Sequence, residues 1–311
     1  MTLLPLGGLA NRMRAILSAI SLSDDTGTPL QIIWRTDPLL NCPFRQLFQP
    51  FAPEVALVDN NTASAVTFAP SRRLNGHIPG IVRRLRHIAS MNDKDIIRLR
   101  TALHSASPAG ADIPELVARQ MRHFATGNNT FIASGLNFYP PKSHAYNDWF
   151  RPTPQLADSI NDITSKFTPH TVAVHIRRTD NAQSIAQSPL QAFIDAMRND
   201  IALRPHTDFF LATDDQGVKA QLNALFPGRI TTSPTPANRH SPEGIRDALT
   251  EMYALSKAPY FHGSYYSAFS DIAMCLSKGK CDVVRVGADA HTANLPDMDE
   301  NYFFVRDMTT V

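Results

Sequence analysis

The chain has 311 residues, a length that favours two domains, each large enough to bury its own hydrophobic core. Apolar residues make up 43% of the sequence and charged residues 19%, a globular balance that excludes wholesale disorder. Lys and Arg total 30 against 28 Asp and Glu, so the formal charge is only +2, and neither a nucleic acid nor a membrane surface is expected as a partner. No apolar run has the length of a membrane span.

The first half opens with a predicted β-α-β arrangement. Thr2 to Leu6 has the composition of a strand, Gly7 and Gly8 predict a turn, and apolar residues recur at helical spacing from Leu9 to Ile20. Three later apolar runs have strand length: Gln31 to Trp34, Val55 to Val58 and Thr130 to Ala133. This order predicts a wound α/β sheet across the first half.

A less regular stretch, from Ser71 to Asn129, lies before the last of these strands. Within it, apolar residues from Ile78 to Ile88 fit one helical face, which places Arg83, Arg84 and Arg86 elsewhere on the surface. The arginines from Arg72 to Arg86 allow an anionic acceptor or a nucleic acid as ligand, but a solvated amphipathic helix is the interpretation that we favour.

Prolines mark the predicted boundary between two domains. Pro140 and Pro141 are followed by Pro152 and Pro154, and proline denies hydrogen bonds to helices and to sheet ladders. We therefore predict a first domain over residues 1–150 and a second over residues 151–311.

The second half alternates helices and strands throughout. The predicted helices are Pro154 to Phe167, Ser188 to Leu203, Gln216 to Phe226, Glu243 to Ser256 and Ala268 to Leu276. The predicted strands are Thr171 to Arg177, Asp208 to Ala212, Arg229 to Thr232, Pro259 to His262 and Cys281 to Val286. Strands separated by helices predict a parallel sheet with right-handed crossovers, so the expected fold class is α/β.

The most informative segment is V-A-V-H-I-R-R-T-D-N, from Val172 to Asn181. Because side chains alternate along a strand, His175 and Arg177 point away from the face that the aliphatic residues share. Ligands of open α/β sheets bind beyond the carboxyl ends of the strands, which is where His175, Arg177 and Arg178 arrive. Guanidinium groups suit phosphate oxygens, and an imidazole beside them can donate to or stack near a base or ribose. The residues alone equally allow two strand-end arginines paired to Asp180 and a neighbouring acid.

The same segment resembles a signature of a known family. H-I-R-R-T-D, from His175 to Asp180, is similar to the motif of the GDP-fucose-dependent fucosyltransferases, in particular the α-1,6 enzymes that act on N-glycan cores and rhizobial nodulation oligosaccharides. Three further motifs follow in family order and spacing: F-L-A-T-D-D at Phe210 to Asp215, S-P-E-G-I-R-D-A-L-T-E-M at Ser241 to Met252, and F-H-G-S-Y-Y-S-A-F-S at Phe261 to Ser270. The opening G-G-L-A-N-R, from Gly7 to Arg12, is similar to the glycine and Asn turn at the start of these enzymes.

This resemblance implies a GT-B fold, in which two Rossmann-like domains face a cleft, and an inverting, metal-independent glycosyltransferase. Such an enzyme would transfer L-fucose from GDP-fucose to a hydroxyl of a glycan acceptor. The second domain would hold most of the donor, and the first would lie on the acceptor side. No cofactor and no metal ion are expected. A transferase that uses another GDP-sugar stays an alternative, because nothing in the sequence identifies a fucose pocket.

Carried over by position, the resemblance also gives roles to individual residues. Arg177 would bind the β-phosphate of GDP and stabilise it as the leaving group, with Arg178 in support. His175 and Glu251 would recognise the guanosine moiety. The other expected donor-binding residues are Gly8, Asn11, Ser264 and Ser267.

Local sequence allows simpler roles for some acidic and hydroxyl side chains. Ser267 comes just before a predicted helix, where it would either hydrogen-bond a phosphate beside free N–H groups or serve as an N-cap. Glu251 lies one turn after Asp247, and without the resemblance both acids fit a solvated helix face. Asp214 and Asp215 follow a strand, and we expect them to cap the next helix rather than to contact the donor or Arg178.

One departure from the family pattern concerns the catalytic base. The core fucosyltransferases carry a carboxylate a few residues after the H-x-R-R motif that is thought to deprotonate the acceptor, but Asn181 to Gln187 contains none. Either deprotonation needs little help in an oxocarbenium-like displacement, or an acid of the first domain serves, with Asp148 and His144 as candidates. A non-catalytic relative that binds a nucleotide or a glycan and has lost the base is the second hypothesis.

Cysteine usage and the amino-terminal segment indicate the compartment. Cys42, Cys275 and Cys281 have irregular spacing, which predicts reduced thiols and a cytoplasmic protein. The apolar segment from Ala15 to Leu22 is interrupted by serines and followed by acids, which disfavours a secretory signal. D-M-D at Asp297 to Asp299 resembles a metal-binding motif of another glycosyltransferase fold, but its Pro-containing loop favours a solvated turn.

Overall fold

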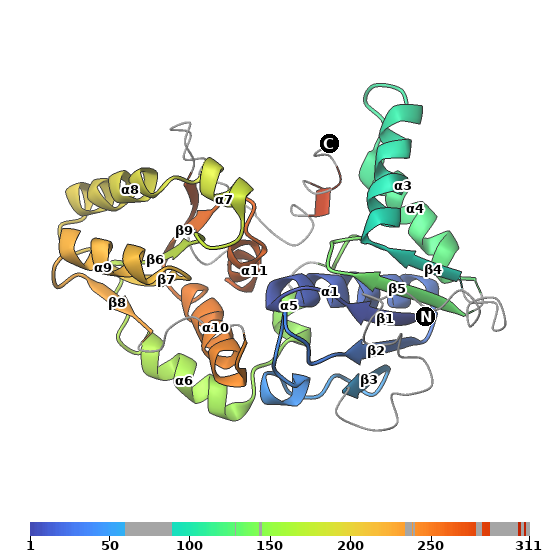
Figure 1. The fold of residues 1–311 in the computed structure, drawn as a ribbon, viewed down its shortest axis with the longest axis horizontal. Coiled ribbons are helices and arrows are strands. Elements are labelled where there is room, and N and C mark those ends of the chain that lie inside the picture. Colours follow the sequence, from blue (N-terminus) through green and yellow to red (C-terminus); the bar gives the residue numbers. More distant parts are fainter. Residues whose placement is uncertain are drawn as a thin grey trace. The chain divides into compact units, whose positions relative to one another are not determined.

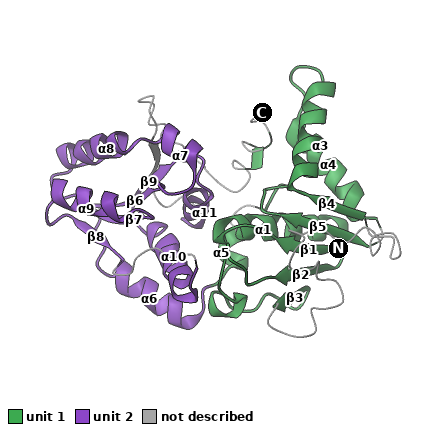
Figure 2. Cartoon of the chain, viewed as in Figure 1, with its two compact units in different colours: residues 1–151, 300–311 green, residues 152–299 purple. Residues whose placement is uncertain are grey.

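The chain forms two compact units. The computed structural model describes residues 1–59, 89–127, 129–142, 145–233, 238, 240–277, 282–286, 304–305 and 308. Unit 1 comprises Met1–Arg151 with Glu300–Val311, and unit 2 comprises Pro152–Asp299 (Figure 2). The predicted helix from Ile78 to Ile88 with its arginines lies outside the described residues, as do His144, Cys281 and Asp297 to Asp299.

Unit 1 is built on a parallel sheet of five described strands in the order β3-β2-β1-β5-β4 (Figure 1). Its strands are β1 (Thr2–Pro5), β2 (Leu30–Trp34), β3 (Val55–Asp59), β4 (Ala89–Asn92) and β5 (Thr130–Ser134). Its helices are α1 (Leu9–Thr26), α3 (Asp93–Ala106), α4 (Ile113–Ala125) and α5 (Ala145–Trp149), with a short 3-10 turn η1 (Phe44–Gln46).

Helix α1 follows β1 through a turn that needs glycine. Gly7 has a φ of +80°, a conformation that side-chain-bearing residues rarely adopt, and Gly27 ends the helix at a φ of +64°. Between them Met13, Ile16 and Leu17 are fully buried against the sheet. The predicted β-α-β opening is confirmed.

The stretch before β5, in which only the helix from Ile78 to Ile88 was predicted, holds β4, α3 and α4 in its described part. Helix α3 begins with a capping box, in which the Asn92 side chain accepts from the helix backbone and the Asp95 side chain accepts from the Asn92 N–H. Ile96 is its only fully buried residue, but Ile96, Leu99 and Leu103 recur at helical spacing, so the sequence carried a signal for α3 that the prediction missed.

Unit 2 contains a second parallel sheet of five described strands, in the order β10-β9-β6-β7-β8. Its strands are β6 (Thr171–Ile176), β7 (Asp208–Thr213), β8 (Ile230–Thr232), β9 (Tyr260–Ser264) and β10 (Asp282–Val286). Its helices are α6 (Pro154–Thr164), α7 (Ala182–Gln187), α8 (Leu190–Leu203), α9 (Gln216–Leu225), α10 (Pro242–Leu255) and α11 (Ala268–Leu276).

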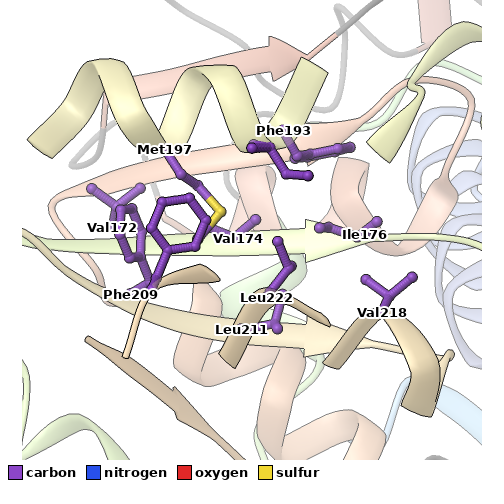
Figure 3. Close-up of a cluster of buried hydrophobic side chains, with 11 residues drawn as sticks. Val172, Val174, Ile176, Phe193, Met197, Phe209, Leu211, Val218 and Leu222 are labelled. Atoms are coloured by element: carbon purple, nitrogen blue, oxygen red, sulfur yellow. The ribbon is translucent and has the colours of Figure 1, made fainter. Parts of the chain in front are cut away.

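The core of unit 2 lies between β6 and β7 on one side and α8 and α9 on the other (Figure 3). Val172, Val174 and Ile176 of β6 pack there against Phe193 of α8 and Leu222 of α9. Helices α10 and α11 lie on the opposite face of the sheet (Figure 1). The predicted α/β class with parallel sheets is therefore confirmed in both units.

No helix within the described ranges combines the length and the apolar character that crossing a membrane requires.

Candidate functional site

The candidate site lies at the carboxyl end of β6, the central strand of the unit 2 sheet. β6 pairs with β7 on one side and with β9 on the other, so three strand ends meet at this edge. The chain leaves β6 toward β7 and β8 and later returns on the other side to β9 and β10. Such a reversal of strand order is where open α/β sheets bind their ligands.

Side chains alternate along β6, so His175 lies on the face opposite the aliphatic core, as predicted. His175 points away from the aliphatic core and toward α11, where its Nδ1 lies 2.7 Å from Ser270 Oγ. The imidazole also stacks on Phe269, with ring centroids 4.7 Å apart and planes 26° apart. One helix thus fixes both the position and the plane of the buried His175 ring.

Arg177 emerges just beyond the strand and is held by acids. Its Nη1 lies 2.7 Å from Asp214 Oδ2, and its Nη2 donates to Asp180. Both pairings belong to the ion-pair interpretation that the sequence left open. They engage two of the guanidinium's five N–H donors, and the side chain keeps 22% exposure, so the group still has donors for an anion.

Asp214, which follows β7, connects this strand to the loop from Arg177 to Asp180 that follows β6. Its carboxylate accepts from the Arg178 N–H at 2.7 Å, and from the N–H and hydroxyl of Thr179 at 3.3 and 2.7 Å. Asp215 instead caps α9 by accepting from the N–H groups of Gly217 and Val218. The capping prediction is thus confirmed for Asp215 and wrong for Asp214, whose side chain turns back across the sheet to the neighbouring strand end.

Arg178 supports the loop from inside. Its guanidinium donates to the carbonyl oxygens of Arg177 at 3.0 Å and Ser188 at 2.7 Å, and lies 5.9 Å from the Phe193 ring centroid. Burial lowers the pKa of this guanidinium, an effect that the nearby Asp214 and Asp215 oppose. These contacts hold the loop in place, and the part of Arg178 in binding a phosphate stays a prediction.

Ser264 joins β9 to the strand end that carries the arginine. Its hydroxyl donates to the His175 carbonyl oxygen and accepts from the Arg177 N–H, each at 3.1 Å. The side chain therefore completes the β6 hydrogen bonding where the regular ladder stops. Direct binding of a donor by Ser264 stays a prediction.

Removing this hydroxyl is expected to destabilise unit 2. Ser264→Ala removes the partner of the buried His175 carbonyl and of the partly buried Arg177 N–H, and we expect the free energy of unfolding to fall by about 1–3 kcal/mol. Urea unfolding measures this change. Ser159→Ala, which removes a single bond to Gln155 on the surface of α6, is the control and should change the free energy by less than about 0.5 kcal/mol. Equal losses in both variants would contradict the bridging role.

The start of α11 contributes Ser267 and depends on a close approach to β9. Ser267 occupies the N-cap position and is buried, but its side chain makes no capping hydrogen bond. A Cβ added to Gly263 would lie 2.4 Å from Met274 Cε and 3.2 Å from Ser270 Cβ, so a larger residue there would require the Met274 side chain to move. The N-cap interpretation of Ser267 is thus right in position, and its phosphate role stays a prediction.

Glu251 does not lie on a simple solvated helix face. Its side chain is partly exposed, yet burial raises its pKa to about 8, an increase that Lys219 opposes and Asp247 adds to. A carboxyl with this pKa is mostly protonated at neutral pH. The sequence motif identified Glu251 as a candidate but did not indicate that its pKa is raised.

The predicted site residues of unit 1 cluster around the glycine turn. The Asn11 side chain lies against Gly7, where an added Cβ would be 2.8 Å from Asn11 Nδ2, and Gly8 occupies the N-cap of α1. Arg12 is fully buried and donates to the Gly7 carbonyl at 2.8 Å and to Asp37 at 2.7 Å. Arg12 thus anchors the turn internally, a role that its charge alone did not indicate.

The segment at the position of the family's base forms α7. Asn181 caps this helix by accepting from the Ser184 N–H at 3.0 Å, and its Nδ2 donates to the Tyr266 carbonyl at 2.7 Å. Asn181 therefore ties the end of the H-I-R-R-T-D motif to the turn before α11. Within the described residues, no three His, Cys, Asp or Glu side chains are grouped as a metal site would require.

Comparisons with known proteins bear on the fold. No family model and no curated protein matched the chain. Fucosyltransferase NodZ from Bradyrhizobium is 18% identical with a TM-score of 0.62, over 95% of this chain and 98% of that one. NodZ α-1,6-fucosyltransferase soaked with GDP-fucose is 20% identical with a TM-score of 0.61, over 94% and 97% of the two chains. A mutant of Arabidopsis thaliana FUT1 in complex with GDP is 13% identical with a TM-score of 0.54, over 91% and 69%.

These likenesses show the fold of the chain. The family resemblance implied a GT-B-type α/β fold with two Rossmann-like units, and the two parallel sheets together with the fucosyltransferase structures confirm it.

Proposed function

We propose that this protein is a glycosyltransferase that transfers L-fucose from GDP-fucose to a hydroxyl group of a glycan. The observation that carries the proposal is Arg177, held at the strand end by Asp214 and Ser264 with N–H donors still available. The fold shared with NodZ structures, one of them soaked with GDP-fucose, supports the same conclusion.

The chemistry follows from how charge moves during transfer. When the glycosidic bond breaks, the diphosphate gains negative charge, and a guanidinium fixed beside it stabilises the transition state more than the ground state. Arg177 would provide this stabilisation, so no metal ion is needed to neutralise the leaving group. The acceptor hydroxyl would attack from the opposite face of the sugar and invert the anomeric centre.

Recognition of the nucleotide would fall to His175, Glu251 and Ser267. The guanine edge presents N–H donors that suit a carboxylate, and the N–H groups at the start of α11 suit a phosphate. We propose that unit 2 binds the donor and that unit 1 binds the acceptor, with Gly8 and Asn11 of the glycine turn as further candidates for contact with the donor.

A non-catalytic nucleotide-binding or glycan-binding relative is the second candidate. The observation that favours it is α7: the segment from Asn181 to Gln187 forms a capped helix at the position of the family's base and contains no carboxylate. Hydrolysis of GDP-fucose, or its transfer to any glycan, separates an enzyme from this relative. A parallel assay with other GDP-sugars separates a fucosyltransferase from a transferase of different donor specificity.

GDP is expected to stabilise the protein without added divalent metal. A ligand that binds only the native state adds about 2.7 kcal/mol at a hundredfold excess over its dissociation constant, which raises the melting temperature measured with EDTA present. UDP and ADP should raise it less. Hydrogen exchange should also slow at His175 to Arg178 and at Gly263 to Ser267. Protection confined to unit 1, or equal shifts with all three nucleotides, would contradict the donor assignment.

A further inference from the structure

Arg177 shares its guanidinium between two carboxylates in different surroundings. The Asp214 side chain is 13% exposed and contacts Nη1, whereas the Asp180 side chain is 45% exposed and contacts Nη2. Water and salt screen an exposed ion pair, so such a pair contributes little and separates easily. The pair with Asp214 is better shielded and persists more readily.

Asp214 has further partners besides Arg177. Asp214 accepts three hydrogen bonds besides its ion pair, from the Arg178 N–H and from the N–H and hydroxyl of Thr179. These bonds keep the carboxylate in place whatever occupies the rest of the guanidinium. Asp180 lies at the other end of the same short loop, three residues after Arg177.

We propose that the two carboxylates have divided roles, an inference that rests on the proposed function. Asp214 is a positioning residue that holds Arg177 permanently, and Asp180 occupies the place on Arg177 that a phosphate oxygen of the donor takes. A carboxylate and a phosphate present the same kind of oxygen to a guanidinium fork, so the two compete for it. A diphosphate has more charge and more oxygens than Asp180, and it displaces this acid.

Binding of the donor therefore begins with an exchange of anions. Asp180 covers only part of the guanidinium, and the donor must break this pair to take its place. Removal of the competing charge should strengthen donor binding, while removal of the positioning charge should weaken it. The two acids on one guanidinium are thus expected to respond in opposite directions.

Titration calorimetry of the whole chain with GDP and with inorganic pyrophosphate tests this division. Asp180→Asn is expected to lower the dissociation constants of both ligands about two- to fivefold, the range of an exposed ion pair. Asp214→Asn is expected to raise them at least about tenfold. In turnover of GDP-fucose, Asp214→Asn should lower kcat more than it raises KM, because a misplaced Arg177 acts on the transition state.

Two control variants match the charge changes. Asp195→Asn removes an exposed acid that also pairs with an arginine three residues away on unit 2, Arg198, at 3.7 Å. Asp208→Asn removes an acid at the other end of β7 that accepts from the hydroxyls of Thr168 and Thr171. Both should bind GDP and pyrophosphate like the parent, which separates local competition from net charge and from stability.

Each outcome decides the inference. If Asp180→Asn binds no more tightly than the parent while the parent binds GDP, the competition is wrong and the proposed function is unaffected. If Asp214→Asn is folded and binds normally, the positioning role is wrong. If Asp214→Asn fails to fold, Asp180→Asn alone decides the competition. A parent that binds neither GDP nor pyrophosphate overturns the proposed function and this inference together.

Discussion

Replacing Arg177 by alanine is expected to lower turnover of GDP-fucose about 10²- to 10³-fold, roughly 2.7–4 kcal/mol of transition-state stabilisation. The loss should fall mainly on kcat, because the charge that the guanidinium stabilises develops as the bond to the diphosphate breaks. Steady-state kinetics with GDP-fucose, supported by a melting curve to show that the variant folds, measure the effect.

A second variant, Arg177→Lys, tests the geometry of the phosphate contact, and Arg198→Ala is the control. Lysine keeps the charge but loses the planar fork, so Arg177→Lys should also be badly impaired if the phosphate contact is bidentate. Arg198 is 59% exposed on α8 and pairs with Asp195, and its removal should leave turnover unchanged. A folded Arg177→Ala variant with the parent's turnover would remove the central element of the proposed mechanism.

Glu251→Gln is expected to stabilise the protein at pH 8 and to change how stability depends on pH. The Glu251 carboxyl titrates at about 8 in the folded chain against a reference value of 4.5. Because its folded pKa is raised, the unfolded chain loses this proton first as pH rises, and the free energy of unfolding falls between pH 4.5 and 8. The full difference is about 5 kcal/mol, and a neutral glutamine avoids it.

Urea unfolding of parent and variant at pH 5 and pH 8 measures this difference. The parent should lose more stability than Glu251→Gln over that interval. Glu243→Gln, on the first turn of the same helix with its side chain 67% exposed, should behave like the parent. At pH 8, where about half of the Glu251 side chains are ionised, Glu251→Gln should also bind GDP more weakly, because a carboxylate offers two acceptor oxygens to neighbouring N–H donors and an amide offers one. Identical pH dependence in the parent and Glu251→Gln would show that the pKa of Glu251 is not raised in the folded chain.

Regular alternation made the second half predictable. The helix from Ala268 to Leu276 was predicted with the bounds that the structure has, and the strand beginning at Thr171 ends one residue earlier than predicted. Here apolar residues at period two or 3.6 face a single core, so local pattern and packing agree. Helix α7 was missed because its six residues carry no apolar stripe, and its start depends on the Asn181 cap.

The sequence identified residues of the candidate site, but it did not predict most of the contacts that they make. The strand pattern placed His175 and Arg177 on the correct face, because alternation is a local property. The role of Asp214 was not predictable, since adjacent acids after a strand differ only in the direction of their side chains. The bridge made by Ser264 depends on the pairing of strands far apart in the sequence, which no local signal reports.

The strand orders of the two sheets bear on the history of the chain. Numbered from the first strand of each unit, the described strands of unit 1 run 3-2-1-5-4, whereas those of unit 2 run 3-2-1-4-5. In unit 1 the last strand lies beside the first, and in unit 2 the fourth strand takes that place. A tandem duplication of one ancestral half copies its strand order unchanged. The two described halves therefore do not arise from duplication alone, and their common architecture reflects the way helices and parallel strands pack.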